Sequence, residues 1–132
     1  DRGFLDKPKI KAQDINNNGQ ELISVGINDL VSQAINKISE NDISQLPVMD
    51  NGKMVGSITE GHLIQKLSEN TEHKNEKVGN IMQSPFQIVD SNLQLEDISA
   101  KFDKDTGAVM YQDEKNRYRI ITKHDVIKAI AT

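Results

Sequence analysis

The stretch that decides the fold reads LPVMDNGKMVGSIT and occupies residues 46–59. It consists of two runs of strand-forming residues separated by Asn51-Gly52. An Asn-Gly pair between two such runs is a strong signal for a tight β-hairpin, because both residues tolerate the positive φ angles that the turn needs. We therefore predict one strand on each side of this turn, as part of a small sheet.

The sequence around this hairpin recurs later in the chain. The segment VGINDLVSQAINKI at residues 25–38 aligns with VDSNLQLEDISAKF at residues 89–102, at an offset of 64 residues (89 − 25). In both copies apolar residues recur at the i, i+3, i+7 spacing of an amphipathic helix. Asn28 and Asn92 precede these residues, and we expect each to cap its helix. The chain therefore contains two copies of an internal repeat.

Each copy reads strand, helix, strand, strand, helix. This pattern predicts a mixed α/β (α+β) fold of two repeats, packed with pseudo-twofold symmetry around a shared core. Such a pair creates two related clefts between the copies, where we expect ligand. The predicted strands lie near 22–25, 46–50, 54–58, 86–89, 107–111 and 117–122, and the predicted helices near 29–40, 60–69, 93–102 and 123–131.

The domain boundaries follow from the repeat. We assign residues 9–70 to the first copy and residues 77–132 to the second. The polar residues 71–76 between them are predicted to be a linker. Because the chain begins with Asp rather than Met, we expect residues 1–8 to be a linker from a missing upstream domain.

The composition excludes several classes of function. A net charge of −4 disfavours nucleic acids and anionic membranes, and only three Phe and two Tyr are available for stacking on bases. No run is apolar enough for a membrane span. The chain has no Cys, and its three His share no metal-ligand spacing, so we expect no metal site. We identify no catalytic residue, and we expect a cytoplasmic location.

One short motif could carry binding chemistry. Thr122 and Asp125 lie where a predicted strand gives way to a helix, so backbone N–H groups and the helix dipole favour an anion there. The Asp125 carboxylate, one helical turn along, could accept the two vicinal hydroxyls of a ribose. The same Thr-x-x-Asp spacing is also a capping-box variant that merely closes a helix end. Both interpretations stay open at this point.

The whole pattern resembles the CBS domain, and specifically the tandem pair called a Bateman module. The first copy keeps the family hallmark Pro-Val-x-Asp-x-Gly-x-x-x-Gly, and the second copy keeps less of it. Within the family, the order of motifs is similar to the C-terminal regulatory region of cystathionine beta-synthase and related cysteine synthases. The segments that carry this narrower likeness are Gly3-Phe4-Leu5, Thr59-Glu60-Gly61-His62-Leu63 and Val78-Gly79-Asn80-Ile81.

The resemblance implies a regulatory module without catalytic machinery. Such modules bind AMP, ADP, ATP or S-adenosylmethionine, often pair into homodimers, and control an attached domain, here a pyridoxal-phosphate (PLP) enzyme. Thr-x-x-Asp is the nucleoside signature of the family, and the positions that would surround the base follow from it. The implied ligand-binding residues are Thr122, Asp125, Ile120, His124, Ile43, Gln45 and Leu22. Ile43 and Ile120 are equally compatible with ordinary core positions.

Two features refine this expectation. In the first copy His62 stands where the acidic residue would be, so we interpret that site as degenerate or as binding something else. In the second copy Arg119, Lys123 and His124 favour a phosphate, and hence AMP or ATP over S-adenosylmethionine. The alternative function is a ligand-free dimerisation module that assembles its enzyme. In either case we expect a homodimer in which the four helices supply the contacts, because their faces carry many aliphatic residues.

Overall fold

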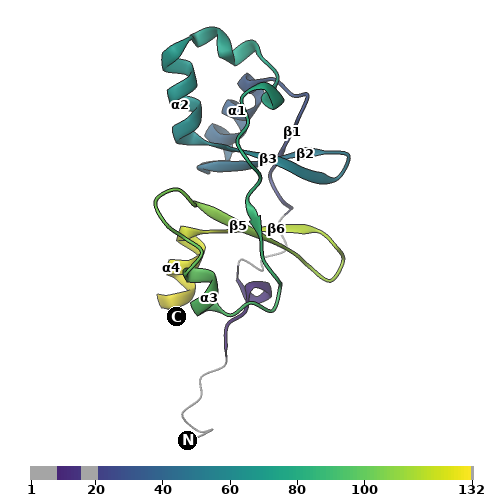
Figure 1. Ribbon diagram of the computed structural model, residues 1–132, viewed down its shortest axis with the longest axis vertical. Helices are drawn as coiled ribbons and strands as arrows, with labels where there is room; N and C mark the ends of the chain where they lie inside the picture. Colours follow the sequence, from purple (N-terminus) through teal and green to yellow (C-terminus); the bar gives the residue numbers. More distant parts are fainter. Residues whose placement is uncertain (1–8, 16–20, 132) are drawn as a thin grey trace, which may run out of the picture. The chain divides into compact units, whose positions relative to one another are not determined.

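The computed structural model describes residues 9–15 and 21–131. The chain forms two compact units. The first-repeat unit comprises Ile23–Phe86, and the second-repeat unit combines Asp1–Leu22 with Gln87–Thr132. Each unit holds a three-stranded mixed sheet with two helices over one of its faces (Figure 1). The mixed α+β class that the sequence predicts is confirmed.

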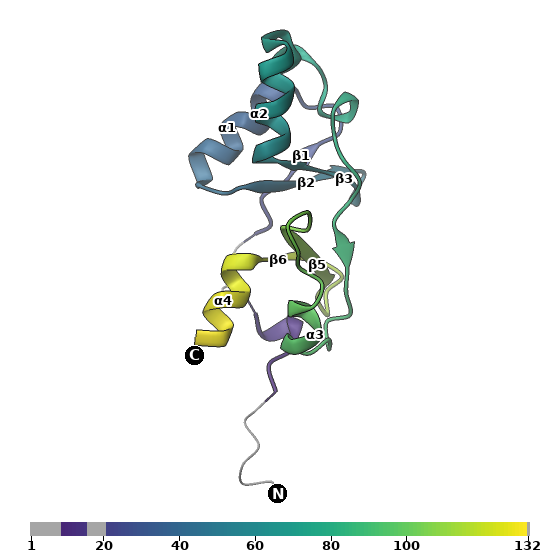
Figure 2. The same cartoon turned by 60° about the vertical axis from the view of Figure 1, so that its left-hand side comes forward.

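In the first-repeat unit the strands β1 (Val25–Gly26), β2 (Gln45–Asp50) and β3 (Lys53–Thr59) follow the order β1-β2-β3. β1 pairs parallel with β2, and β3 pairs antiparallel with β2. Asn51 and Gly52 have φ angles of 52° and 81°, so the Asn-Gly hairpin forms as predicted. Helices α1 (Val31–Asn41) and α2 (Glu60–Glu69) cover the sheet, as Figure 2 also shows. The buried core is Val25, Val31, Ala34, Ile38, Leu46, Val48, Ile58, Leu63, Val78 and Ile81.

The second-repeat unit has the same topology. Its sheet order is β4 (Gln87–Ile88), β5 (Ala108–Gln112) and β6 (Tyr118–Thr122), with β4 parallel and β6 antiparallel to β5. Helices α3 (Leu95–Ser99) and α4 (Lys123–Ala131) complete it. Its buried core is Ala12, Ile15, Val89, Ile98, Val109, Tyr111, Ile121 and Val126.

Each unit contains a short lead-in segment that precedes the other repeat's strands in the sequence. Residues 10–15, with the 3-10 helix η2 (Ala12–Asp14), pack in the second-repeat unit, and residues 76–81, with η4 (Val78–Asn80), pack in the first. The hydrogen bonds repeat: the N–H of Ala12 donates to Leu93 O at 2.9 Å, and that of Val78 donates to Asp29 O at 2.7 Å. Both lead-in segments are therefore exchanged in the same way.

This exchange changes the interpretation of the predicted domain boundaries. Residues 9–70 and 77–132 describe the repeats along the sequence, but neither range is a compact unit, because residues 77–86 pack with the first repeat. The predicted linker 71–76 is also structured. Most of it forms the 3-10 helix η3 (Thr71–Asn75), which contacts α1 and α2 and is capped by the side chain of Asn70.

The predicted helix caps at Asn28 and Asn92 are wrong. α1 and α3 begin later, with Leu30 and Gln94 at their N-cap positions. The cause is again the lead-in segment. Its carbonyl oxygens accept the first helical N–H groups, from Val31 to Glu76 O and from Leu95 to Ile10 O, each at 2.8 Å. A side-chain cap at residue 28 or 92 is therefore not needed.

Helix α3 is shorter than the predicted 93–102 and ends at Ser99. The Ser99 hydroxyl donates to Leu95 O at 2.8 Å, a back-bond that competes with helix continuation. Asp103 then accepts the N–H groups of Asp105 and Thr106, each at 2.8 Å, and so fixes a turn.

Candidate functional site

The predicted Thr122–Asp125 motif forms a closed set of hydrogen bonds at the junction of β6 and α4. Asp125 Oδ2 accepts from the Thr122 N–H and from the Thr122 hydroxyl, each at 2.9 Å. The Asp125 N–H donates in return to Thr122 Oγ1 at 3.3 Å. This is the reciprocal geometry of a capping box, so the structural interpretation of the motif is confirmed.

The cap does not use all the binding capacity of this corner. Both side-chain bonds of Asp125 end on Oδ2, which leaves Oδ1 without a hydrogen bond from the residues that the structure describes. Lys123 and His124 occupy the first two helical positions, where backbone N–H groups have no partner within the helix. Both of their side chains are exposed. The corner therefore offers a carboxylate oxygen beside two backbone donors.

The other predicted site residues are divided between the two units. Ile120 and Leu22 belong to the second-repeat unit and are half-buried. Because side chains alternate along a strand, Ile120 and Thr122 share one face of β6, and the fully buried Ile121 lies on the other. Ile43 and Gln45 belong to the first-repeat unit, where Ile43 packs against the core and Gln45 pairs with Thr59. The part that these four residues would have in binding stays a prediction.

The equivalent corner of the first-repeat unit is occupied by the protein itself. Thr59 Oγ1 accepts from the His62 N–H and donates to Gln83 Oε1, both at 3.2 Å. The His62 ring nitrogen Nε2 lies 2.7 Å from Ile81 O and donates to it. Gln83 also pairs through its backbone with Ser57 on the edge of β3. His62 thus ties α2 to the end of the lead-in segment, which gives its replacement of the acidic residue a structural reason.

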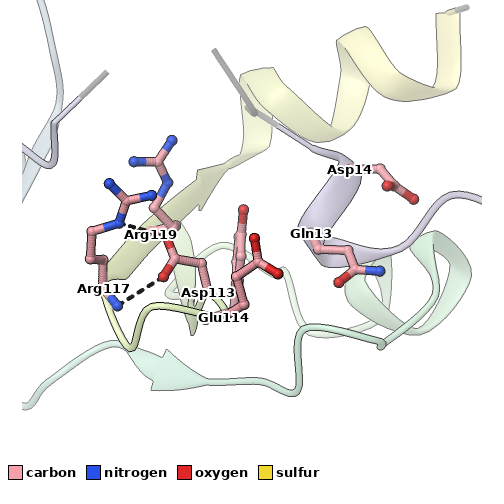
Figure 3. A pocket seen from close by; sticks show the side chains of 7 residues that line it. Gln13, Asp14, Asp113, Glu114, Arg117 and Arg119 are labelled. Carbon is pink, nitrogen blue, oxygen red and sulfur yellow. Dashed lines mark hydrogen bonds and ion pairs between the residues drawn. The ribbon is translucent and has the colours of Figure 1, made fainter. Parts of the chain in front are cut away.

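Arg119 does not lie beside Thr122, contrary to what the sequence suggests. Arg119 is two residues before Ile121 on β6 and therefore lies on the helix-facing side of the strand, opposite to Thr122. It pairs across the sheet with Tyr111 and lines a separate hollow (Figure 3). Arg119 thus does not add a positive charge beside Thr122, and only Lys123 and His124 remain for that part.

The hollow that Arg119 lines was not predicted, although the long polar loop between β5 and β6 is visible in the sequence. It measures about 290 Å³ and lies within the second-repeat unit, between this loop and η2. Its lining residues are Gln13, Asp14, Tyr111, Asp113, Glu114, Arg117 and Arg119.

The pKa values of two side chains that line the hollow, Asp113 and Tyr111, are shifted. The backbone N–H of Arg117 donates to Asp113 Oδ1 at 2.9 Å, and Arg117 Nε donates to Oδ2 at 2.9 Å. The backbone bond from Arg117 is the main cause that lowers the pKa of Asp113, so this carboxylate stays ionised. Burial raises the pKa of Tyr111, against the opposing effect of the neighbouring Arg119, so its hydroxyl stays protonated.

Comparison with known protein families matches the sequence of this chain to one family. The model of the CBS domain matches the chain twice, over residues 13–69 and 78–132. The chain belongs to the CBS domain family. The two matches coincide with the two repeats, so the chain is a tandem CBS pair, as predicted.

Relatives of this CBS pair have been found in sequence and in structure. An uncharacterized protein of Methanocaldococcus jannaschii is 26% identical over 98% of this chain and 42% of that protein. The chain therefore spans about two fifths of that relative's length. The CBS domain pair of protein MJ0100, solved with 5-methylthioadenosine and S-adenosylmethionine, is 22% identical with a TM-score of 0.78, covering 94% of this chain and 98% of that one. CBSX2, solved with AMP, is 22% identical with a TM-score of 0.71, covering 92% and 96%.

Two features are absent from the part of the CBS pair that the structure describes. No cluster of three or more His, Cys, Asp or Glu side chains there could hold a metal ion. No helix there is long and apolar enough to cross a membrane.

Proposed function

We propose that this CBS pair is a non-catalytic regulatory module that senses an adenosine compound, with AMP or ATP preferred. The observation that carries the proposal is the Thr122–Asp125 corner. Its free Oδ1 can accept a ribose hydroxyl, and the N–H groups of Lys123 and His124 can donate to a phosphate. The likeness to CBS structures solved with AMP and with S-adenosylmethionine supports an adenosyl ligand.

The preference for a nucleotide rests on charge. A phosphate gains from the helix N-terminus and from the exposed Lys123 and His124, whereas the sulfonium of S-adenosylmethionine is repelled by the same groups. With Arg119 on the other face of β6, this argument rests on two side chains rather than three. The base would lie near Ile120 and Leu22.

The likeness to the regulatory region of cystathionine beta-synthase extends the proposal to the controlled activity. We expect the module to act on an attached PLP-dependent enzyme of that kind. The support is the order of motifs in the sequence, above all Thr59–Leu63 and Val78–Ile81. A copurified or fused enzyme whose rate changes on adding AMP or ATP would test this extension.

A ligand-free assembly module is the second candidate. Its support is the first-repeat unit, where the Thr59 hydroxyl and the His62 ring bond to the protein's own Gln83 and Ile81. A corner closed in this way has a structural role, because its hydroxyl and its ring already bond to the protein. If the second corner were also closed by the protein's own residues, assembly would be the remaining function of the module.

Titration calorimetry with AMP, ATP and S-adenosylmethionine separates the two candidates. We expect Asp125→Asn to abolish nucleotide binding, because it removes the negative acceptor for the ribose. The Asn side chain still has an oxygen for the Thr122 N–H, so the variant should lose no more than about 1 kcal/mol of stability. The matched control is Asp105→Asn, which neutralises an exposed carboxylate of the same unit.

The possible results differ clearly. Nucleotide binding by wild type and Asp105→Asn but not by Asp125→Asn supports the sensor. Unchanged affinity in Asp125→Asn would show that Asp125 is only a cap. Binding of S-adenosylmethionine alone would overturn the charge argument, and no binding at all would favour the assembly module.

A further inference from the structure

The hollow between η2 and the β5–β6 loop is separate from the corner at Thr122. Arg119 and Ile121 lie on the helix-facing side of β6, and Thr122 lies on the opposite side. All seven lining residues belong to the second-repeat unit. A ligand in this hollow would therefore touch a different surface from a nucleotide bound to Asp125.

The hollow carries charged groups of both signs that the protein leaves partly unused. Arg117 bonds to Asp113 through Nε. Its two terminal guanidinium nitrogens make no hydrogen bond with the residues that the structure describes. Neither the Glu114 carboxylate nor the Gln13 amide makes a side-chain hydrogen bond within the same described residues. In Figure 3 the guanidinium groups of Arg117 and Arg119 lie at one end and Gln13 at the other, with Glu114 between them.

The positions of the first-repeat unit that correspond to two lining residues of this hollow are tightly packed. By the repeat, Gly56 corresponds to Arg119 (56 + 63) and Gly79 to Gln13 (79 − 66). These glycines are packed tightly: a Cβ on Gly56 would lie 2.4 Å from Met82 Sδ, and one on Gly79 would lie 2.8 Å from Ile27 Cγ1. The second repeat thus replaces a filled, glycine-lined contact with charged side chains around a space.

We propose that this hollow binds a small zwitterion of the α-amino acid class. Its carboxylate would bind the terminal nitrogens of Arg117, with Arg119 adjacent, because a guanidinium recognises a carboxylate through two parallel N–H bonds. Its ammonium group would bind the Glu114 carboxylate, and Gln13 would contact a polar side chain. A volume of about 290 Å³ accommodates a molecule of this size. The CBS pair would then respond to two chemically different effectors.

Two-dimensional NMR of the 15N-labelled chain tests the proposal at residue resolution. The probes are the twenty L-amino acids, added one at a time at millimolar concentration. Acetate, methylamine and inorganic phosphate serve as ligands that carry only one sign of charge. We expect at least one amino acid to shift the backbone signals of Glu114, Arg117 and Gln13 while leaving those of Thr122 and Asp125 in place.

Glu114→Gln is the decisive variant, because its exposed carboxylate makes no contact on which the fold depends. Losing a charge-assisted bond should weaken amino acid binding by roughly tenfold or more. The control is Lys115→Gln, a charge change of one unit at the next residue, outside the lining of the hollow. We expect Asp125→Asn to keep full amino acid affinity, which separates this proposal from the nucleotide site.

Several outcomes would overturn the proposal. One is that no amino acid shifts these signals. Another is an equal response to acetate or phosphate, which would indicate a simple anion site. Equal affinity in Glu114→Gln and wild type would remove the assigned ammonium partner. Signals that move only around Thr122 would place the amino acid in the nucleotide corner instead.

Discussion

At the scale of single residues, two glycines that look alike in the sequence have opposite structural roles. Gly56 is buried on β3, where a Cβ would lie 2.4 Å from Met82 Sδ and 2.9 Å from Gln83 O. Gly61 lies in the first turn of α2, and no atom comes within 4 Å of a Cβ built there. The motif alone cannot distinguish them, because the contact to Gly56 comes from a segment 26 residues later (82 − 56).

We predict that Gly56→Ala destabilises the chain by about 1–3 kcal/mol, because Met82 and the backbone at Gln83 must move to admit the methyl group. Gly61→Ala should instead stabilise it by about 0.5 kcal/mol, since Ala is the better helix former. Urea denaturation of both variants and wild type measures the difference. Equal stability of the two variants would contradict the packing described at Gly56.

Asp113 provides a pH-dependent prediction. Hydrogen bonds from Arg117 and Lys115 hold its folded-state pKa below the ordinary value of 3.8. Such a group stabilises the fold above its unfolded pKa, and this contribution is lost as the pH falls through the lower folded pKa. Asp113→Asn should therefore lower the melting temperature at pH 7, and its deficit relative to wild type should shrink below about pH 4.

The matched control for this experiment is Glu114→Gln. Glu114 is the neighbouring exposed carboxylate. A melting-temperature difference between Asp113→Asn and wild type that is the same at pH 7 and at pH 3 would contradict the assigned role of the carboxylate charge.

The sequence predicted the Thr122–Asp125 motif but could not decide between its two interpretations. In the structure the cap forms through Asp125 Oδ2, and Oδ1 accepts no hydrogen bond from the described residues, so the two roles are compatible at Asp125. Arg119 was misplaced for a different reason. Counting residues along the chain put it near Thr122, whereas the alternation of a strand puts it on the opposite face.

At the scale of secondary structure, the elements that local sequence patterns predict are the ones that the structure confirms. Both hairpins and helices α1, α2 and α4 lie close to their predicted ranges, because turn residues and apolar periodicity act over a few residues. The starts of α1 and α3, and the packing of each lead-in segment with the other repeat, were not predicted. Their hydrogen bonds join residues 49 (78 − 29) and 81 (93 − 12) positions apart, and no local pattern encodes such a partner.

The exchanged lead-in segments predict which fragments fold. A fragment of residues 23–86 contains the whole core of the first-repeat unit, including Val78 and Ile81. We expect it to show a cooperative thermal transition by circular dichroism. The contiguous repeat, residues 9–70, lacks these two buried residues and the acceptor for the Val31 N–H, so we expect it to be unfolded or to melt without cooperativity.

The two fragments differ in length by only two residues (64 against 62), which makes them a matched pair. Cooperative melting of residues 9–70 with failure of residues 23–86 would contradict the unit boundaries. The variant Val78→Ala in the full chain gives a second measurement. Val78 is fully buried, so we expect its truncation to lower the free energy of unfolding by about 1–2 kcal/mol.

At the scale of the whole molecule, the repeat leaves equivalent apolar side chains uncovered in both units. Ile64 of α2 and Ile127 of α4 occupy matching positions (64 + 63), and each is 64% exposed. Ile130, on the same helix as Ile127, is equally exposed. Two units that diverged in charge and loop length have kept the same exposed Ile, which favours a role in association over chance.

We therefore predict that the chain is a homodimer through α2 and α4, and that the double variant Ile64→Glu/Ile127→Glu is a monomer. Two buried charges without partners at an interface should raise the dimer dissociation constant by at least a hundredfold. The control pair Gln65→Glu/Lys128→Gln alters the net charge by the same two units at adjacent exposed positions, and it should stay dimeric. Sedimentation equilibrium at micromolar concentration measures both. A wild-type chain that is monomeric throughout would refute the dimer, and a dimer that survives the double variant would place its interface away from these helices.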